Sequence, residues 1–224
     1  MNAALRKSPL FAHITDADID SCLECSRSET VVYEKDEPIF LQQSRPQKLF
    51  ILLDGSVAVC RDSMSGKRAI VTTIGEPGEL FGEVFLFLDK SEYDNYAVAV
   101  TRATVLQMPK SFLKHTCVRA CGYHSVLIAN MLTILAEKAY YLSRKLQIVS
   151  SPTLRQKITK VLLQSMAADG TVMLSMNREA LADFLNVARP SLSRELMSMQ
   201  VDGLLTISGR KIKILNLAAL QEDI

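Results

Sequence analysis

Hydrophobic and polar residues follow a strand-like pattern through the middle of the chain. Between Thr30 and about Met108, short β-rich runs are separated by Gly, Pro, Asp and Ser. Strands at such regular spacing predict an antiparallel sandwich or barrel, here a jelly roll. The predicted strands are Thr30–Tyr33, Pro38–Leu41, Lys48–Leu53, Ser56–Arg61, Arg68–Ile74, Tyr96–Val100 and Thr104–Met108.

Both flanks of this region have helical periodicity instead. Residues Pro9 to Cys25 place Leu10, Ile14, Ile19 and Leu23 at apolar positions, which predicts a helix. Thr15 followed by Asp18 resembles an N-terminal capping box.

A longer helix is predicted from about Val126 to Ile148, a stretch without Gly or Pro. At about 23 residues it would be about 35 Å long, too long for one small sandwich to cover its apolar stripe. We therefore expect a parallel helix from a second copy as its partner, and a core helix of one larger domain is the alternative. The stripe consists of Leu127, Met131, Ile134, Leu135, Lys138, Leu142 and Leu146.

Ser150-Ser151-Pro152 ends this helix, because proline disfavours helical geometry in the preceding residue. A helix at Thr153–Met166 and a strand at Thr171–Leu174 follow. Two short helices joined by a tight turn and a hairpin around Ser208-Gly209 complete the chain. The two helices and their turn predict a helix-turn-helix, a motif whose second helix lies in the DNA major groove. A hairpin directly after the motif is typical of its winged form.

The predicted fold class is therefore α+β, with three parts. Residues 1–125 are expected to form the effector-sensing jelly roll, 126–150 the dimerisation helix, and 151–224 the winged-helix DNA-binding domain.

Composition adds little to this picture. The chain has 224 residues, 48% hydrophobic and 22% charged, with a net charge of +2. Residues 1–150 hold 17 basic and 17 acidic side chains, whereas residues 151–224 hold 9 and 7, a small excess that is compatible with DNA binding. No apolar run approaches the roughly 18 residues of a membrane span, and the N-terminus lacks a secretory signal. We expect a cytoplasmic protein with no membrane partner.

The second helix of the pair carries most of the candidate DNA contacts. Leu192, Leu196 and Met199 should pack inward, which leaves arginines on the opposite side. An arginine fork can donate two hydrogen bonds to guanine, worth roughly 1–3 kcal/mol of discrimination. The cations of the hairpin, Lys213 included, suit phosphates. A merely solvated helical face is the alternative. The candidates are Arg189, Pro190, Ser191, Ser193 and Arg194 on this helix, Asn177 as the cap of the first helix, and Arg210 and Lys211 on the hairpin.

Four blocks occur in one order along the chain: Leu52–Val59, Gly75–Glu83, Ala129–Val149 and Leu181–Leu204. Together they resemble the cyclic-AMP receptor protein/FNR (Crp/Fnr) superfamily of bacterial transcription regulators, nearly end to end. The resemblance implies a cyclic-nucleotide-binding-type jelly roll and a homodimer on a two-fold symmetric DNA operator, with RNA polymerase as a further partner. The superfamily often has a glutamate, which contacts a cytosine, where this chain has Pro190. We therefore expect a different operator sequence.

The resemblance also bears on the effector. Cyclic-nucleotide binders of the superfamily hold the ribose with a Gly-Glu pair and the phosphate with an Arg-Ser pair about ten residues later. Gly82 and Glu83 match the first pair, whereas Tyr93 and Asp94 stand in the second place. An aspartate would repel a cyclic phosphate, so we expect that cyclic AMP is not the effector.

A pocket for another, unidentified effector is expected between the barrel and the long helix. Its carboxylates suit an amine or hydroxyls, and its tyrosines suit an aromatic body. A purely structural role for Glu83 is the alternative. The candidate effector-binding residues are Leu80, Phe81, Gly82, Glu83, Asp94, Tyr140, Tyr141 and Ser143.

Cysteines offer a rival sensor, a redox- or metal-responsive one. Cys22 and Cys25 share a face of the first helix, and Cys117, Cys121 and His124 would share a side of a continuous helix, with His115 nearby. These ligand types permit zinc or another metal. The oxygen sensors of the superfamily, however, carry a cysteine cluster before the first helix plus one cysteine in the barrel, which this chain lacks. The haem-binding positions are also unmatched, so no metal or cofactor is predicted, and buried structural cysteines are the usual case.

An enzyme built on the jelly roll is the last alternative. Enzymes of the cupin type bind metal through clustered histidines in the barrel. His13, His115 and His124 all fall outside the predicted strands. We therefore expect no enzymatic activity.

Overall fold

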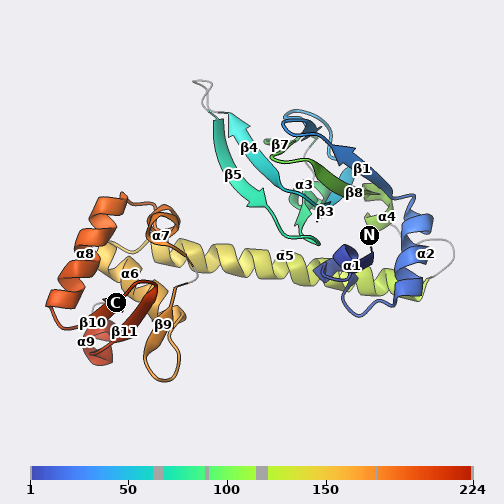
Figure 1. Cartoon of the computed structure of the whole chain (residues 1–224). Coiled ribbons are helices and arrows are strands. Elements are labelled where there is room, and N and C mark those ends of the chain that lie inside the picture. The colour runs from blue at the N-terminus through green and yellow to red at the C-terminus, as the bar shows by residue number, and fades with distance from the viewer. Residues whose placement is uncertain (1, 63–67, 89–90, 115–120, 175, 223–224) are drawn as a thin grey trace. The chain divides into compact units, whose positions relative to one another are not determined.

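The computed structural model describes residues 2–62, 68–88, 91–114, 121–174 and 176–222 (Figure 1). The chain divides into two compact units, Met1–Glu137 and Lys138–Ile224. One helix, α5 (Gly122–Val149), continues through the boundary between them. In the part of the chain that is described, no helix combines the length and apolar character needed to cross a membrane.

The first unit contains the predicted jelly roll, built from two four-stranded antiparallel sheets. Each predicted strand is confirmed to within one residue at either end, and the two-residue β6 is an addition. One sheet has the order β1 (Glu29–Tyr33), β8 (Ala103–Pro109), β3 (Lys48–Asp54), β6 (Leu80–Phe81). The other has the order β2 (Pro38–Phe40), β7 (Tyr96–Ala99), β4 (Val57–Asp62), β5 (Arg68–Ile74).

Strand β3 is buried on both faces, which explains its continuous apolar sequence. Phe50 and Leu52 point into the barrel interior, where they pack with residues of both sheets. Leu49 and Ile51 point to the other face and join a cluster made with the N-terminal helices and α5. The outer face of this sheet is thus the surface on which the helices of the unit pack.

The N-terminal helix begins later than predicted. Pro9–Phe11 forms a separate 3-10 helix, η1, and His13 has a left-handed φ of 63° that interrupts the chain. Helix α2 (Asp16–Ser26) then starts at Thr15, whose hydroxyl accepts the Asp18 N–H at 3.3 Å. The predicted cap is therefore confirmed, but the start of the helix at Pro9 was wrong because apolar spacing alone does not reveal a break in φ.

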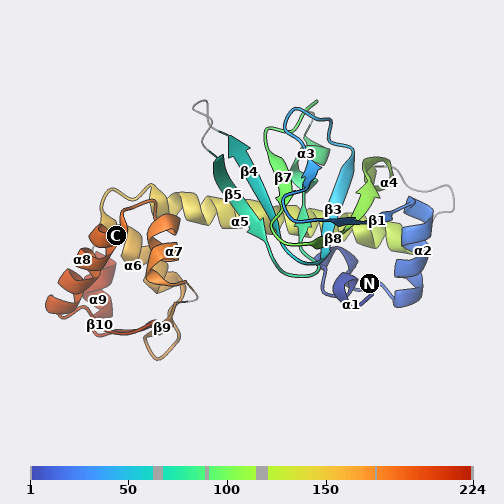
Figure 2. The ribbon, with the colours of Figure 1, turned by 45° about the horizontal axis from the view of Figure 1, so that its top comes forward.

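The first half of α5 packs against the jelly roll through Leu127, Met131 and Ile134. The side chain of Asn130 donates hydrogen bonds to the carbonyls of Leu10 at 2.9 Å and Ala12 at 2.8 Å. These contacts fix α5 to the N-terminal segment (Figure 2). The unit also contains the short helices α1 (Asn2–Leu5), α3 (Glu83–Phe87) and α4 (Lys110–Lys114).

The second unit has the predicted winged helix-turn-helix. Its core joins the end of α5 to apolar residues of the helices and of the three-stranded sheet, whose order is β10-β11-β9. Thr153 caps α6 in a full capping box with Gln156. The elements are α6 (Leu154–Gln164), β9 (Thr171–Met173), α7 (Arg178–Phe184), α8 (Arg189–Val201), β10 (Leu205–Ser208), β11 (Lys211–Ile214) and α9 (Leu217–Glu222).

Candidate DNA-binding and effector sites

Helix α8 has one buried side and one exposed side. Leu192, Leu196 and Met199 are at most 2% exposed, so their predicted inward packing is confirmed. Pro190 lies in the first turn, where its missing N–H leaves no hydrogen bond unmade. The candidates Arg189, Pro190, Ser193 and Arg194 are all exposed, whereas Ser191 is partly buried.

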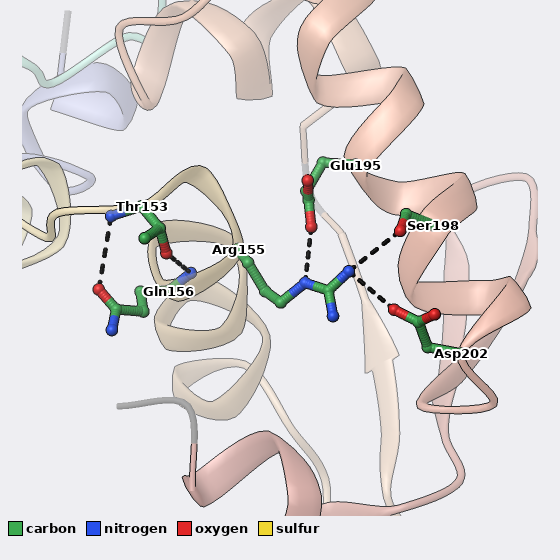
Figure 3. A network of polar contacts seen from close by, with 6 residues as sticks. All are labelled: Thr153, Arg155, Gln156, Glu195, Ser198 and Asp202. Atoms are coloured by element: carbon green, nitrogen blue, oxygen red, sulfur yellow. Dashed lines mark hydrogen bonds and ion pairs between the residues drawn. The ribbon is translucent and has the colours of Figure 1, made fainter.

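Arg155 of α6 contacts α8 and the residue that follows it, Asp202 (Figure 3). Its Nε donates to a Glu195 carboxylate oxygen at 2.7 Å, and its Nη2 donates to Asp202 at 2.8 Å and to Ser198 at 3.0 Å. These contacts raise the pKa of Arg155, with the hydrogen bond to Glu195 as the largest cause. The one positive charge of Arg155 is thus shared between Glu195 of α8 and Asp202 at its C-cap. Arg189 and Arg194 are exposed elsewhere on the helix.

Helix α7 and the following turn set the position of α8. The side-chain oxygen of Asn177 accepts the Ala180 N–H at 2.8 Å, so its predicted capping role is confirmed. The turn uses Asn186 at a left-handed φ of 54°, a conformation that asparagine tolerates better than most residues. The chain then enters α8 from Ala188.

Arg178, the first residue of α7, is a candidate that the sequence interpretation missed. Its guanidinium is partly buried, and desolvation lowers its pKa. Among the described residues, its Nη1 has no hydrogen-bond partner. A cation in the first turn of a helix also opposes the helix dipole. That unfavourable placement is the sequence signal that could have singled out Arg178.

The hairpin presents its cations at the tip. Gly209 turns the chain with a left-handed φ of 61°, and Arg210 and Lys211 beside it are exposed. Lys213 differs from them, because its ammonium donates to the Asp169 carbonyl. Arg210 and Lys211 are thus the hairpin residues best placed for phosphates.

In the first unit, the candidate effector residues of β6 and α3 point in different directions. Leu80 packs on the outer face with the helices, whereas Phe81 packs in the barrel interior. Gly82 has a φ of 79°, and a Cβ there would lie 3.0 Å from the Phe50 ring. Glu83 begins α3 and is 3% exposed. Leu80 therefore does not share the barrel interior with Phe81.

Tyr93 fills the barrel interior beside this turn. Its ring stacks on Phe40 at 4.1 Å between centroids and meets Phe85 edge-on at 5.2 Å. Phe40 and Phe81 each stack on Phe50, at 5.5 and 5.2 Å. Burial raises the pKa of Tyr93 to about 12, and its hydroxyl has no hydrogen-bond partner among the described residues. A neutral phenol thus stands where the resemblance places a phosphate-binding arginine, with Asp94 exposed beside it.

Three candidate effector residues lie on α5 beyond the boundary at Glu137. Tyr140 and Tyr141 are 64% and 56% exposed, and Ser143 is also exposed. The guanidinium of Arg144 lies 5.6 Å from the centre of the Tyr140 ring. Their predicted role in closing an effector pocket stays a prediction.

The cysteine and histidine candidates are distributed differently from the prediction. Helix α5 begins at Gly122, so Cys121 precedes the helix and the proposed continuous helical face was wrong there. His124 is 2% exposed and stacks on Phe112 at 4.6 Å. His115 and Cys117 lie outside the described residues. Among the residues that are described, no group of three His, Cys, Asp or Glu could hold a metal ion.

Comparisons with known proteins agree with both units. The family model of the cyclic nucleotide-binding domain matches residues 30–119, and that of the Crp-like helix-turn-helix domain matches residues 156–223. Such a pairing defines a class of DNA-binding transcription regulators.

Relatives and solved structures share the full architecture. The chain is 24% identical to the cyclic AMP receptor protein of Thermus thermophilus over 97% of both chains. It resembles the catabolite activator protein structure from Thermus thermophilus, with a TM-score of 0.50, 24% identity and coverage of 96% and 98% of the two chains. A c-di-GMP-responsive global regulator of Xanthomonas campestris gives a TM-score of 0.55 at 17% identity, with coverage of 88% and 99%.

The chain belongs to the Crp/Fnr superfamily and is a DNA-binding transcription regulator of that type. The superfamily is made up of transcription regulators, which points to a function other than catalysis.

Proposed function

We propose that a homodimer of this chain binds a two-fold symmetric DNA operator and regulates transcription from it. Helix α8 of each copy would lie in the major groove of one half-site, and the two half-sites would be about 34–36 Å apart. The supporting observation is the exposed pair Arg189 and Arg194 on α8, whose one carboxylate, Glu195, is paired with Arg155 of α6.

Exposed apolar residues on α5 support the dimer. Leu132, Leu142 and Leu146 are each more than 60% exposed, at 63%, 62% and 63%. Burying such side chains in a dimer interface stabilises the dimer by roughly 25 cal/mol per Å² of apolar surface removed from water. A parallel α5 from a second copy covers them in the way a coiled coil does.

The candidate residues divide by the kind of DNA contact they make. Arg189 and Arg194 contact base edges and give specificity, with Ser193 between them. Arg178, Arg210 and Lys211 contact phosphates, which positions the domain and adds affinity. Pro190 has no side-chain donor or acceptor, so it contributes shape alone. Asn177 acts through its cap on α7.

A selection of bound sequences from random DNA tests this function with the full chain. We expect enrichment of a two-fold symmetric site. Arg189→Ala or Arg194→Ala should then cost about 1–3 kcal/mol and relax the preference at one position of each half-site. Arg210→Ala and Lys211→Ala should weaken all sequences alike and reduce the salt slope by about 1 each.

Lys35→Ala, an exposed lysine on the jelly roll, is the matched charge control and should leave binding unchanged. A monomer at high concentration, or enrichment of no sequence at all, would contradict the proposed function.

The same proposal includes control by a small effector other than cyclic AMP. Residues 1–125 act as the sensor, 126–150 as the dimerisation helix and 151–224 as the DNA-binding part. An effector acts through unequal affinity for two arrangements of the dimer. The buried Tyr93 and the exposed Asp94 support the exclusion of cyclic AMP, since neither offers a positive charge to a phosphate.

Titration calorimetry with cyclic AMP tests that exclusion on the full chain. We expect no micromolar binding and no change in operator affinity. Micromolar binding would contradict the exclusion of cyclic AMP. RNA polymerase is the expected further partner, the cytoplasm the expected location, and no enzymatic activity is expected.

A further inference from the structure

Three cysteines from distant parts of the sequence meet in the first unit. Cys22 and Cys25 lie on α2, and Cys121 directly precedes α5. Both views show α2 beside the N-terminal end of α5 (Figures 1 and 2). Cys22 is part of the core cluster against which Cys25 and Cys121 pack. The fold thus unites two cysteine groups that the sequence presents separately.

Tyr123 lines the same cavity as Cys25 and Cys121. Its hydroxyl makes hydrogen bonds with the side chains of both Cys121 and Cys25, and these contacts add to burial in raising the pKa of Tyr123. The same hydroxyl donates to the Ser21 carbonyl at 3.4 Å. The two thiols therefore share one cavity and one neighbouring hydroxyl.

Cys25 and Cys121 are also accessible, unlike the other described cysteines. Both line an open cavity of about 620 Å³ at the junction of α2 and α5. Cys22 and Cys60 are each 0% exposed. A small oxidant in solution therefore reaches Cys25 and Cys121 but neither of the buried thiols.

Charged groups of both signs surround the thiols at this junction. A thiolate is the nucleophile in cysteine chemistry, and helix N-termini and basic residues stabilise it. Cys121 lies at the N-terminal end of α5, a helix of 28 residues. The same cavity is lined by one cation, Arg27, and by the carboxylates of Asp18 and Glu24. Cys22 behaves differently, because burial, followed by the neighbouring Cys25 and Cys121, raises its pKa to about 12.

We propose that Cys25 and Cys121 form a peroxide-responsive dithiol that closes to a disulfide between α2 and the start of α5. One thiol releases its proton to the solvent, and the thiolate attacks hydrogen peroxide. The O–O bond breaks, and the departing hydroxide takes up a proton, which gives a sulfenic acid and water. The second thiol attacks the sulfenic sulfur, an S–S bond forms, and a second water leaves. Two thiols and one peroxide thus give one disulfide and two waters.

The bridge requires Cβ atoms about 3.5–4.5 Å apart. Both residues lie at helix ends that can adjust. Cys25 is in the last turn of α2, just before Arg27 in its left-handed C-cap conformation. Cys121 is followed by Gly122, where even an added Cβ would meet nothing within 4 Å.

Peptide mapping of the full chain tests the proposal. The reduced protein is treated with hydrogen peroxide, its free thiols are counted, and it is digested without reductant for mass spectrometry. We expect the loss of two of the five thiols and a peptide that joins Cys25 to Cys121. Cys25→Ser and Cys121→Ser should each abolish this peptide, whereas Cys60→Ser, at a buried cysteine elsewhere, should preserve it.

Hydrogen exchange gives a second readout that does not depend on the variants. The amides of α2 should exchange at least several-fold more slowly in the oxidised chain and return to the original rate with dithiothreitol. No loss of thiols, a bridge from either residue to Cys22 or Cys117, or oxidation without any bridge would overturn the proposal. None of these outcomes bears on DNA binding, which is measured separately on the reduced chain.

Discussion

The contacts of Arg155 predict the free energy needed to open α8 from the rest of the second unit. Arg155→Met keeps much of the apolar stem but removes the guanidinium that contacts Glu195, Ser198 and Asp202 (Figure 3). Glu195 would then be left partly buried without its cation, next to Arg194. We expect α8 to open more readily from the rest of the unit.

The magnitude follows from the exposure of the partners. Exposed ion pairs contribute about 0–1 kcal/mol, whereas a sheltered hydrogen bond to a charge contributes about 1.5–3 kcal/mol. The Arg155 and Glu195 side chains are 29% and 26% exposed, and that of Asp202 is 43% exposed. We therefore assign about 1.5 kcal/mol to the Glu195 pair and about 0.5 kcal/mol to the Asp202 pair. The sum of about 2 kcal/mol corresponds to about a 30-fold change in an equilibrium constant.

Hydrogen exchange measured on peptides from α8 is the suitable assay, because it reports local opening in the full chain. Arg155→Met should speed exchange of these amides about 30-fold, and Arg155→Lys should recover part of the difference. Arg102→Met is the matched control, because Arg102 pairs with Glu34 on the surface, with side chains 72% and 73% exposed. That variant should change protection in its own region by less than about fivefold.

Unchanged exchange in α8 of Arg155→Met would refute the reasoning, as would equal effects of the two arginine variants. A double-mutant cycle with Glu195→Gln separates the pair from the rest of the network. We expect a coupling of about 1 kcal/mol. Zero coupling would show that Arg155 acts only through packing of its stem.

Three further predictions concern single residues. Asn177→Ala should destabilise α7 by about 1 kcal/mol, visible as faster exchange of its amides, whereas Asn177→Asp should retain the cap. Gly55→Ala should lower the thermal midpoint far more than Gly209→Ala, since both have positive φ but only at Gly55 would a Cβ lie 2.2 Å from a backbone oxygen. Burial raises the pKa of Cys22 from 9.0 and of Tyr93 from 10.0, each to about 12. The folded chain keeps these protons where the unfolded chain releases them, so these two groups should make the free energy of unfolding fall as the pH rises from about 9 to about 12. Cys22→Ala with Tyr93→Phe should flatten the fall, measured by urea denaturation, and an equally steep fall would contradict this linkage.

Much of the fold was predictable because the spacing of apolar residues, and the turn residues between the runs, determine the strands and helices. The strands from β1 to β8 have apolar runs ended by turn residues, and every predicted one is present. Strand β6 was missed because two residues cannot display a period, and it is defined only by its pairing with Phe50 and Ile51. The break at His13 was missed for a related reason, because a positive φ at a single residue leaves the apolar spacing intact.

The arrangement of candidate site residues was predictable where they all lie on one helix. It was less predictable where residues from several elements meet. The two sides of α8 follow from helical spacing, and the Asn177 cap follows from residue type. Tyr93 was assigned to a place in a binding motif, but its stacking on Phe40 depends on strands far away in the sequence. Likewise, only the packing of α2 beside α5 brings Cys25 and Cys121 to one hydroxyl.

The separation of the two sides of α8 has an evolutionary consequence. The residues that contact Arg155 of α6 are different from the exposed residues that the proposed function assigns to contacts with bases. On that proposal, selection can act on each set alone. A descendant can acquire new promoters by exchanging side chains at positions 189, 190, 193 and 194 while Arg155 and its partners keep the domain intact. Divergence of regulons then proceeds without a passage through misfolded intermediates.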